Sequence, residues 1–214
     1  MVVYMDKKFK VLILNGSPRA NGNVALALHE MEKVFEENDV EYENILLGLK
    51  DIRGCIACER CREIGKCVFD DVVNEIAKKF KEADGIVIGS PVYYGSANGT
   101  LMCALQRLFY SSSFDKSMKV GASVVSARRS GCTATFDELN KFFTLSNMTV
   151  ATSQYWNNIY GWEPGEGIVD DEGRQVMRML AKNMVFLMKS IELGKENGGI
   201  PELGEERVWT NFTR

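Results

Sequence analysis

Residues 16–23 form a short polar loop whose composition suits phosphate binding. Four apolar residues, 11–14, precede the loop and are typical of a buried parallel strand. The loop can offer backbone N–H groups, the Ser17 hydroxyl and the Arg19 guanidinium to a dianion where the next helix begins. We therefore expect a phosphate site directly after this strand, with an ordinary capped strand-to-helix turn as the alternative.

Glycine spacing limits which phosphate compound this loop can hold. A dinucleotide fingerprint needs the spacing G-x-G-x-x-G, and a nucleoside-triphosphate loop ends in Gly-Lys-Ser/Thr. Here Gly22 is followed by Asn23 and Val24. The sequence therefore disfavours both dinucleotide and ATP binding.

A compact group of cysteines with the spacing C-x2-C-x2-C-x5-C is the second feature that could carry chemistry. Two consecutive C-x2-C steps let three thiolates surround one small inorganic core, and the fourth can return after a turn at Gly65. A structural zinc site usually takes its ligands from two separated pairs, so the spacing favours a [4Fe–4S] cluster over zinc. Free thiols or a reversible disulfide remain alternatives. The four cysteines are Cys55, Cys58, Cys61 and Cys67.

The other reactive side chains point to no further chemistry. Cys103 falls in a helical pattern and is expected to be a small buried apolar residue, and Cys132 is expected to be an incidental loop thiol. His29, the one histidine, lies off the apolar face of its helix, so we expect a solvated surface residue and no histidine-based catalysis.

Length and charge bound the class of protein. The chain has 214 residues and a formal net charge of -3, and we expect one domain over residues 1–194 followed by a tail at 195–214. Interspersed charges give no electrostatic footprint for nucleic acid or an anionic membrane. We find neither a membrane-spanning apolar run nor a signal peptide, which predicts a cytoplasmic protein. The tail residues Trp209 and Phe212 are expected to pack at a subunit interface, with docking on their own domain as the alternative.

Alternating strand-like and helical segments predict an α/β fold with helices on both faces of a parallel sheet. The third strand is expected to end at Pro91, which cannot donate to further pairing, and residues 92–98 are expected to form a loop. The predicted strands are residues 9–15, 40–47, 85–89, 119–126 and 148–153. The predicted helices are residues 24–35, 72–82, 101–109, 136–143 and 172–193.

Three segments that follow predicted strands should converge on one site, because ligands of open α/β sheets bind beyond the carboxyl ends of the strands. The first is the phosphate loop. The second, residues 90–99, combines tyrosines with flexible glycines and can approach a planar ring with its backbone. The third, residues 126–132, carries Arg128 and Arg129, which can steer an anionic substrate or stabilise charge on a reduced ring.

Together, residues 15–19, 89–95, 98–100 and 128–143 resemble the flavodoxin-like NAD(P)H-dependent FMN reductases, including the iron–sulfur flavoproteins. The resemblance spans roughly residues 9 to 193. It implies a flavodoxin-like three-layer sandwich with a five-stranded parallel sheet of order 2-1-3-4-5. It also implies non-covalent FMN and a homodimer or homotetramer with the flavin near a subunit interface.

The resemblance also assigns site residues by position. Val24 departs from the many relatives that have Thr or Ser there, so its backbone N–H must replace a hydroxyl contact to the phosphate. The residues around the FMN phosphate would be Ser17, Arg19, Asn23 and Val24. Those lining the isoalloxazine would be Pro91, Val92, Tyr93, Tyr94, Gly95 and Ser96. Those near the ring or the ribityl chain would be Arg128, Arg129 and Gly131.

We therefore expect an FMN-dependent oxidoreductase that passes electrons from NAD(P)H to a second acceptor, such as a flavin, a quinone, a nitro compound or a metal. The cofactor supplies the chemistry, so no side-chain acid or nucleophile is required. One alternative is an iron–sulfur flavoprotein with FMN and a [4Fe–4S] cluster that accepts electrons from a ferredoxin-like donor. Another, from a different class, is a non-enzymatic binding module that senses redox state through the cysteines.

Overall fold

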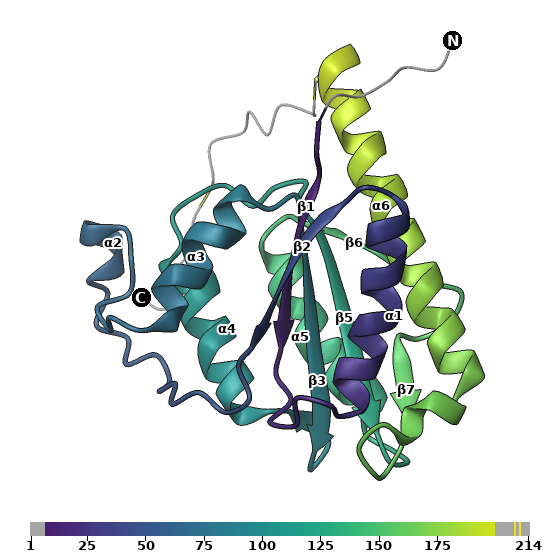
Figure 1. The fold of residues 1–214 in the computed structure, drawn as a ribbon. Coiled ribbons are helices and arrows are strands. Elements are labelled where there is room, and N and C mark those ends of the chain that lie inside the picture. The colour runs from purple at the N-terminus through teal and green to yellow at the C-terminus, as the bar shows by residue number, and fades with distance from the viewer. Residues whose placement is uncertain (1–6, 200–207, 209, 211–214) are drawn as a thin grey trace.

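A computed structural model describes residues 7–199, 208 and 210 as three layers (Figure 1). A mostly parallel sheet forms the middle layer. Helices α1 (Asn23–Glu37) and α6 (Asp171–Asn197) cover one face, and α3 (Val72–Glu82), α4 (Gly99–Ser111) and α5 (Cys132–Leu145) cover the other. Each face buries its own apolar cluster against the sheet, as expected for an α/β sandwich.

The sheet has the predicted strand order. Its path runs β2-β1-β3-β5-β6, and all neighbours on this path are parallel. This order corresponds to the expected 2-1-3-4-5, because the short hairpin strand β4 (Ser96–Ala97) lies off the path. The path strands are β1 (Lys10–Asn15), β2 (Glu41–Leu46), β3 (Gly85–Tyr93), β5 (Val120–Ala127) and β6 (Thr149–Val150).

The prediction that the third strand ends at Pro91 was wrong. Pro91 stands opposite Ser126 of β5, and β3 continues into a hairpin in which Val92 pairs with Ala97. A proline removes only one donor, so a strand can pass through it where that donor is not needed. Residues 92–98 are therefore not a free loop: the hairpin turns at Tyr94 (φ 51°) and Gly95 (φ 80°), the positive angles typical of two-residue hairpin turns.

One strand of the sheet was not expected. Strand β7 (Asn158–Tyr160) pairs in parallel with the last residues of β5, while β6 is shorter than the predicted strand 148–153. Three residues are too few for an alternating pattern to signal a strand. A single 3₁₀ turn at Glu166–Val169 then leads into α6.

The predicted helices are confirmed: the helix over 72–82 has the predicted ends, and the ends of the others are shifted by a few residues. His29 is exposed, as its position off the apolar face of α1 predicted. In the described part of the chain, no helix is both long enough and apolar enough to cross a membrane. Trp209 and Phe212, which we expect at an interface, lie outside the described residues.

A buried carboxylate ties the two helices of one layer together. Glu30 of α1 is only 3 % exposed, and it accepts hydrogen bonds from Lys33, Arg174 and Arg178. Burial would raise the pKa of Glu30, but the hydrogen bonds with Lys33 and Arg178 lower it to about 2. The carboxylate therefore remains ionised and links α1 to α6.

Candidate active site and cysteine pocket

A pocket of about 280 Å³ lies where β1, β3, β5 and β7 end, and we call it the strand-end pocket. It brings together the phosphate loop, the start of the hairpin and the arginine loop, as the topology predicted. Its lining residues are Ser17, Arg19, Gly22, Asn23, Val24, Pro91, Val92, Tyr93, Ser126, Ala127, Arg128, Gly161, Trp162 and Glu163.

Internal hydrogen bonds shape the phosphate loop. The Asn15 side chain accepts from the Ser17 backbone N–H at 2.9 Å, and the Ser17 hydroxyl oxygen accepts from the Arg19 N–H at 3.1 Å. Gly22 precedes α1 without a capping side chain, so no described side chain caps the first turn of this helix. Its N–H groups can therefore receive an anion.

Two predicted phosphate residues have different surroundings from Ser17 and Arg19. The Asn23 amide donates to the carbonyl of Glu163 at 3.1 Å and accepts from the N–H of Gly167 at 2.9 Å. Its side chain therefore ties the start of α1 to the segment after β7. Val24 is 2 % exposed, and its side chain belongs to the apolar core.

The hairpin contributes only its first half to the pocket. Tyr94 and Gly95 form the exposed turn and do not line the pocket. The Ser96 hydroxyl donates to the Glu138 carboxylate of α5 at 2.7 Å, which fixes the returning strand and not the pocket. Gly131 also stands outside the lining: a Cβ there would lie 2.8 Å from Val92 Cγ1, so this glycine lets the arginine loop pack against the hairpin.

The two predicted arginines differ. Both are exposed, but Arg128 lines the pocket, with its guanidinium carbon 5.1 Å from the centre of the Trp162 ring, and Arg129 does not line it. Gly161, Trp162 and Glu163 were missed by sequence reasoning. The aromatic and glycine residues at 160–162 were a weak signal, readable only once β7 is known to end beside β5.

The expectation for Cys132 was also wrong. Cys132 is the first residue of α5 and is 3 % exposed. Burial raises the pKa of its thiol, against the effect of a hydrogen bond with Tyr160. It is a buried helix residue and not a loop thiol. Cys103 is half-buried and packs against the apolar cluster of its layer, less enclosed than predicted.

A second pocket gathers all four cysteines of the compact motif, and we call it the cysteine pocket. It lies in the segment between β2 and α3, which includes the short helix α2 (Cys61–Ile64). Arg107, Tyr110 and Ser111 of α4 also line it. The cysteines are Cys55 and Cys58, which are exposed, and Cys61 and Cys67, which are half-buried.

The cysteine pocket is a small cavity of about 20 Å³ that all four thiols line. Within residues 7–199, 208 and 210, no three Cys, His, Asp or Glu side chains come close enough to hold one metal ion. A zinc site would require such a tetrahedral group. Four thiols spread around a shared space are the donor set that an iron–sulfur cluster takes at its corners.

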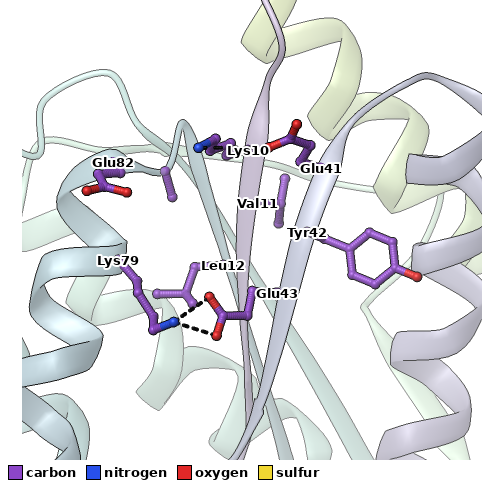
Figure 2. A pocket seen from close by; sticks show the side chains of 9 residues that line it. Lys10, Val11, Leu12, Glu41, Tyr42, Glu43, Lys79 and Glu82 are labelled. Carbon is purple, nitrogen blue, oxygen red and sulfur yellow. Dashed lines mark hydrogen bonds and ion pairs between the residues drawn. The ribbon is translucent and has the colours of Figure 1, made fainter.

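A hollow also lies at the opposite end of the sheet, and an ion pair joins charged side chains that line it. Figure 2 shows Lys79 of α3 pointing to Glu43 of β2, and its ammonium group donates to both carboxylate oxygens, at 2.6 and 2.8 Å. Lys10 and Glu41, the first residues of β1 and β2, lie on its rim. The hollow is therefore away from the carboxyl ends of the strands, and we assign it no part in the site.

Comparison of the sequence with known proteins finds flavoproteins. The family model described as NADPH-dependent FMN reductase matches residues 9–163. An iron-sulfur flavoprotein of Methanocaldococcus jannaschii is 36 % identical over 191 residues, which cover 86 % of this chain and 99 % of that protein. An iron-sulfur flavoprotein of Methanosarcina thermophila is 28 % identical, covering 87 % and 99 %.

Solved structures agree on the fold. RosB with a bound riboflavin-phosphate intermediate superposes with a TM-score of 0.68 at 15 % identity, covering 96 % of this chain and 93 % of that chain. A flavodoxin from the domain Archaea gives a TM-score of 0.57 at 16 % identity, covering 85 % and 99 %. The fold is thus flavodoxin-like, and the chain belongs to the NADPH-dependent FMN reductase family, a family of flavoprotein oxidoreductases.

Proposed function

We propose that the chain binds FMN in the strand-end pocket and passes electrons from NAD(P)H to a second acceptor. One observation carries this proposal. The same pocket contains the start of a helix that no described side chain caps and a wall formed by Pro91, Val92 and Tyr93. The first suits a phosphate dianion and the second suits the flat face of a flavin ring. No adenosine-binding motif accompanies them, which favours FMN over FAD.

Different residues of the pocket would contact different parts of this cofactor. Ser17 and Arg19, with the N–H groups at the start of α1, would hold the phosphate, and residues 91–93 would position the ring. Arg128 would stabilise negative charge near the ring, and Trp162 would exclude water beside it. FMN, when bound, supplies the hydride and electron chemistry, so no side-chain base is required.

A second proposal concerns the cysteine pocket, which we propose takes a [4Fe–4S] cluster. Four thiols lining one pocket support it, and the matched curated relatives are iron-sulfur flavoproteins. With such a cluster the chain would transfer electrons from a ferredoxin-like donor instead of NAD(P)H. In keeping with its family, we also propose that it assembles as a homodimer or homotetramer.

The visible spectrum of anaerobically purified protein tests both proposals. A flavin spectrum that NADPH or NADH bleaches supports the reductase. Broad iron–sulfur absorbance, four irons per chain and slow bleaching by NAD(P)H support the electron-transfer protein. A colourless protein whose thermal stability does not rise with added FMN would contradict both, because a ligand of the native state must stabilise it.

Cys58→Ser tests the cysteine pocket independently of the strand-end pocket. We expect this variant to lose iron–sulfur absorbance and bound iron while keeping its full FMN content, because the thiolates of a cluster act as a set. Cys103→Ser is the matched control, since Cys103 lies outside the cysteine pocket and should leave both signals unchanged. Wild-type protein reconstituted with iron and sulfide that still binds no iron would eliminate the cluster.

A further inference from the structure

Arg107 of α4 is a buried cation at the back of the cysteine pocket. Its side chain is 0 % exposed, and it makes a bidentate ion pair with Asp71 at 2.6 and 2.8 Å. It also lies over the ring of Phe69, 5.0 Å from the ring centre. A buried guanidinium is costly unless its donors are satisfied, so this one is held in place by its partners.

The ion pair uses one side of the guanidinium and leaves another donor for sulfur. The Nε–H of Arg107 donates to Cys67 Sγ at 3.2 Å, while both terminal nitrogens face Asp71. A guanidinium is protonated at every working pH, and the ion pair with Asp71 holds this one in its charged form. The group at the sulfur is therefore a permanent positive charge.

Cys67 is held more firmly than the other thiols of the pocket. Asn74 of α3 accepts from the Cys67 N–H at 3.1 Å and donates to the Cys67 carbonyl at 3.0 Å. The Cys55 sulfur, in contrast, accepts only from the backbone N–H of Ala57 at 3.4 Å. Within the described residues, Arg107 is the one side chain that donates a hydrogen bond to any of the four pocket thiols.

We propose that Arg107 is a positioning residue that fixes the Cys67 sulfur as one corner of the cluster site and raises the reduction potential of the bound cluster. The inference rests on the proposed cluster. Reduction adds one electron to the cluster, so the reduced form carries one more negative charge than the oxidised form. A fixed cation and an N–H donor at a ligand sulfur stabilise that extra charge.

The competing explanation is that Arg107 only neutralises Asp71 and packs α4 against the loop. A pair of variants separates the two roles. Asp71→Asn removes the ion pair but leaves Arg107 beside Cys67, and asparagine can still cap α3 through Val73 N–H. Adding Arg107→Gln to Asp71→Asn removes the cation without leaving a carboxylate unpaired in the interior.

The experiment is an anaerobic redox titration with dithionite of wild-type and variant proteins reconstituted with iron and sulfide, followed by electron paramagnetic resonance. We expect the midpoint potential of the double variant to lie below that of Asp71→Asn, with Arg107→Lys in the same Asp71→Asn background between them because lysine keeps the charge without the forked donors. Arg107→Lys also provides the test if the double variant does not fold.

The outcomes separate this inference from the proposed function. Equal midpoint potentials in iron-loaded wild type, Asp71→Asn and the Arg107 variants would overturn the inference and leave the cluster standing. A wild-type protein that binds no iron would overturn both. A lower potential that appears equally in Asp71→Asn alone would assign the effect to the ion pair and would also overturn the role of Arg107.

Discussion

The strand-end pocket and the cysteine pocket are built in different ways. The first lies where four strands of one sheet end, and the sheet itself fixes the relative positions of its walls. The second lies on an irregular segment between β2 and α3. Asn74 of α3 and Arg107 of α4 hold that segment in place, Arg107 through its ion pair with Asp71 just before α3. A pocket of the first kind survives as long as the fold does. One of the second kind can be lost by a few substitutions that leave the fold intact.

The two regions touch at Gly48, just after β2. A Cβ at this position would lie 2.2 Å from the carbonyl carbon of Ser17, in the phosphate loop. The chain that leaves β2 toward the cysteines therefore passes directly against the backbone that we propose holds the phosphate. Only a residue without a side chain permits this approach.

The largest expected effect confined to one pocket comes from the double variant Ser17→Ala with Arg19→Ala. It should weaken FMN binding by about 2 to 4 kcal/mol, since charge-assisted hydrogen bonds to the phosphate are lost. Fluorescence titration with FMN measures this directly, and iron content after reconstitution should not change. Unaltered FMN affinity would break the assignment of the phosphate site.

Acid should weaken the packing of α1 against α6, because the Glu30 carboxylate that links these helices becomes protonated at low pH. The pKa of Glu30 is lowered from 4.5 to about 2, so its contribution is present above pH 4.5 and is lost as the pH falls toward 2. This contribution is at most about 3 kcal/mol, because the cations around Glu30 are partly exposed and screened by water. Urea unfolding from pH 7 down to pH 2 should show a shallower loss of stability for Glu30→Gln than for wild type.

Glu37→Gln is the control for that titration, because it makes the same change on the solvent side of α1. It should follow the wild-type pH dependence. Parallel curves for Glu30→Gln and wild type would contradict the stabilising role of the buried carboxylate.

Gly48→Ala should disturb the contact between the chain that leaves β2 and the phosphate loop. The added methyl group meets backbone that cannot move aside, so we expect a loss of about 1 to 3 kcal/mol of stability together with weaker FMN binding. Gly194→Ala in α6 is the matched control: a Cβ there meets nothing within 4 Å, and alanine should stabilise the helix by about 1 kcal/mol or less. Gly48→Ala protein with normal stability and normal FMN affinity would show that the loops can separate freely.

Periodicity was enough to predict the main elements of the fold. The helix expected over residues 72–82 has those bounds in the structure, and the parallel strands occur in the expected order. The phosphate loop and residues 91–93 could also be placed in one pocket, because the carboxyl ends of parallel strands must meet at one edge. Whether these residues bind FMN stays a prediction.

Contacts between segments distant in sequence could not be predicted in the same way. Asn23 fits a phosphate loop by its type, yet its amide binds backbone at residues 163 and 167, far along the chain. Pro91 looked like a strand end because pairing partners are invisible in a single sequence. Trp162 reaches the pocket only through the short strand β7, which has too few residues to show a pattern.

The position of Arg107 in the sequence indicates a buried charge. It stands on the same helical face as Ala104, Leu108 and Ser111, all of them buried, at the spacing of three and four residues that marks an apolar stripe. A charged residue inside such a stripe must find an opposite charge. That partner, Asp71, lies 36 residues earlier, and nothing local to either residue connects them.

The support beneath Cys67 changes what a search for related proteins, or a transplantation experiment, must look for. Four cysteines at the right spacing are an incomplete signature, because the last of them depends on an asparagine seven residues later and on an arginine forty residues later. A genome scan that requires Asn74 and Arg107 together with the cysteines should separate chains able to build this pocket from chains that merely contain thiols. Grafting the motif onto a flavodoxin would likewise require α3 and α4 residues to travel with the loop.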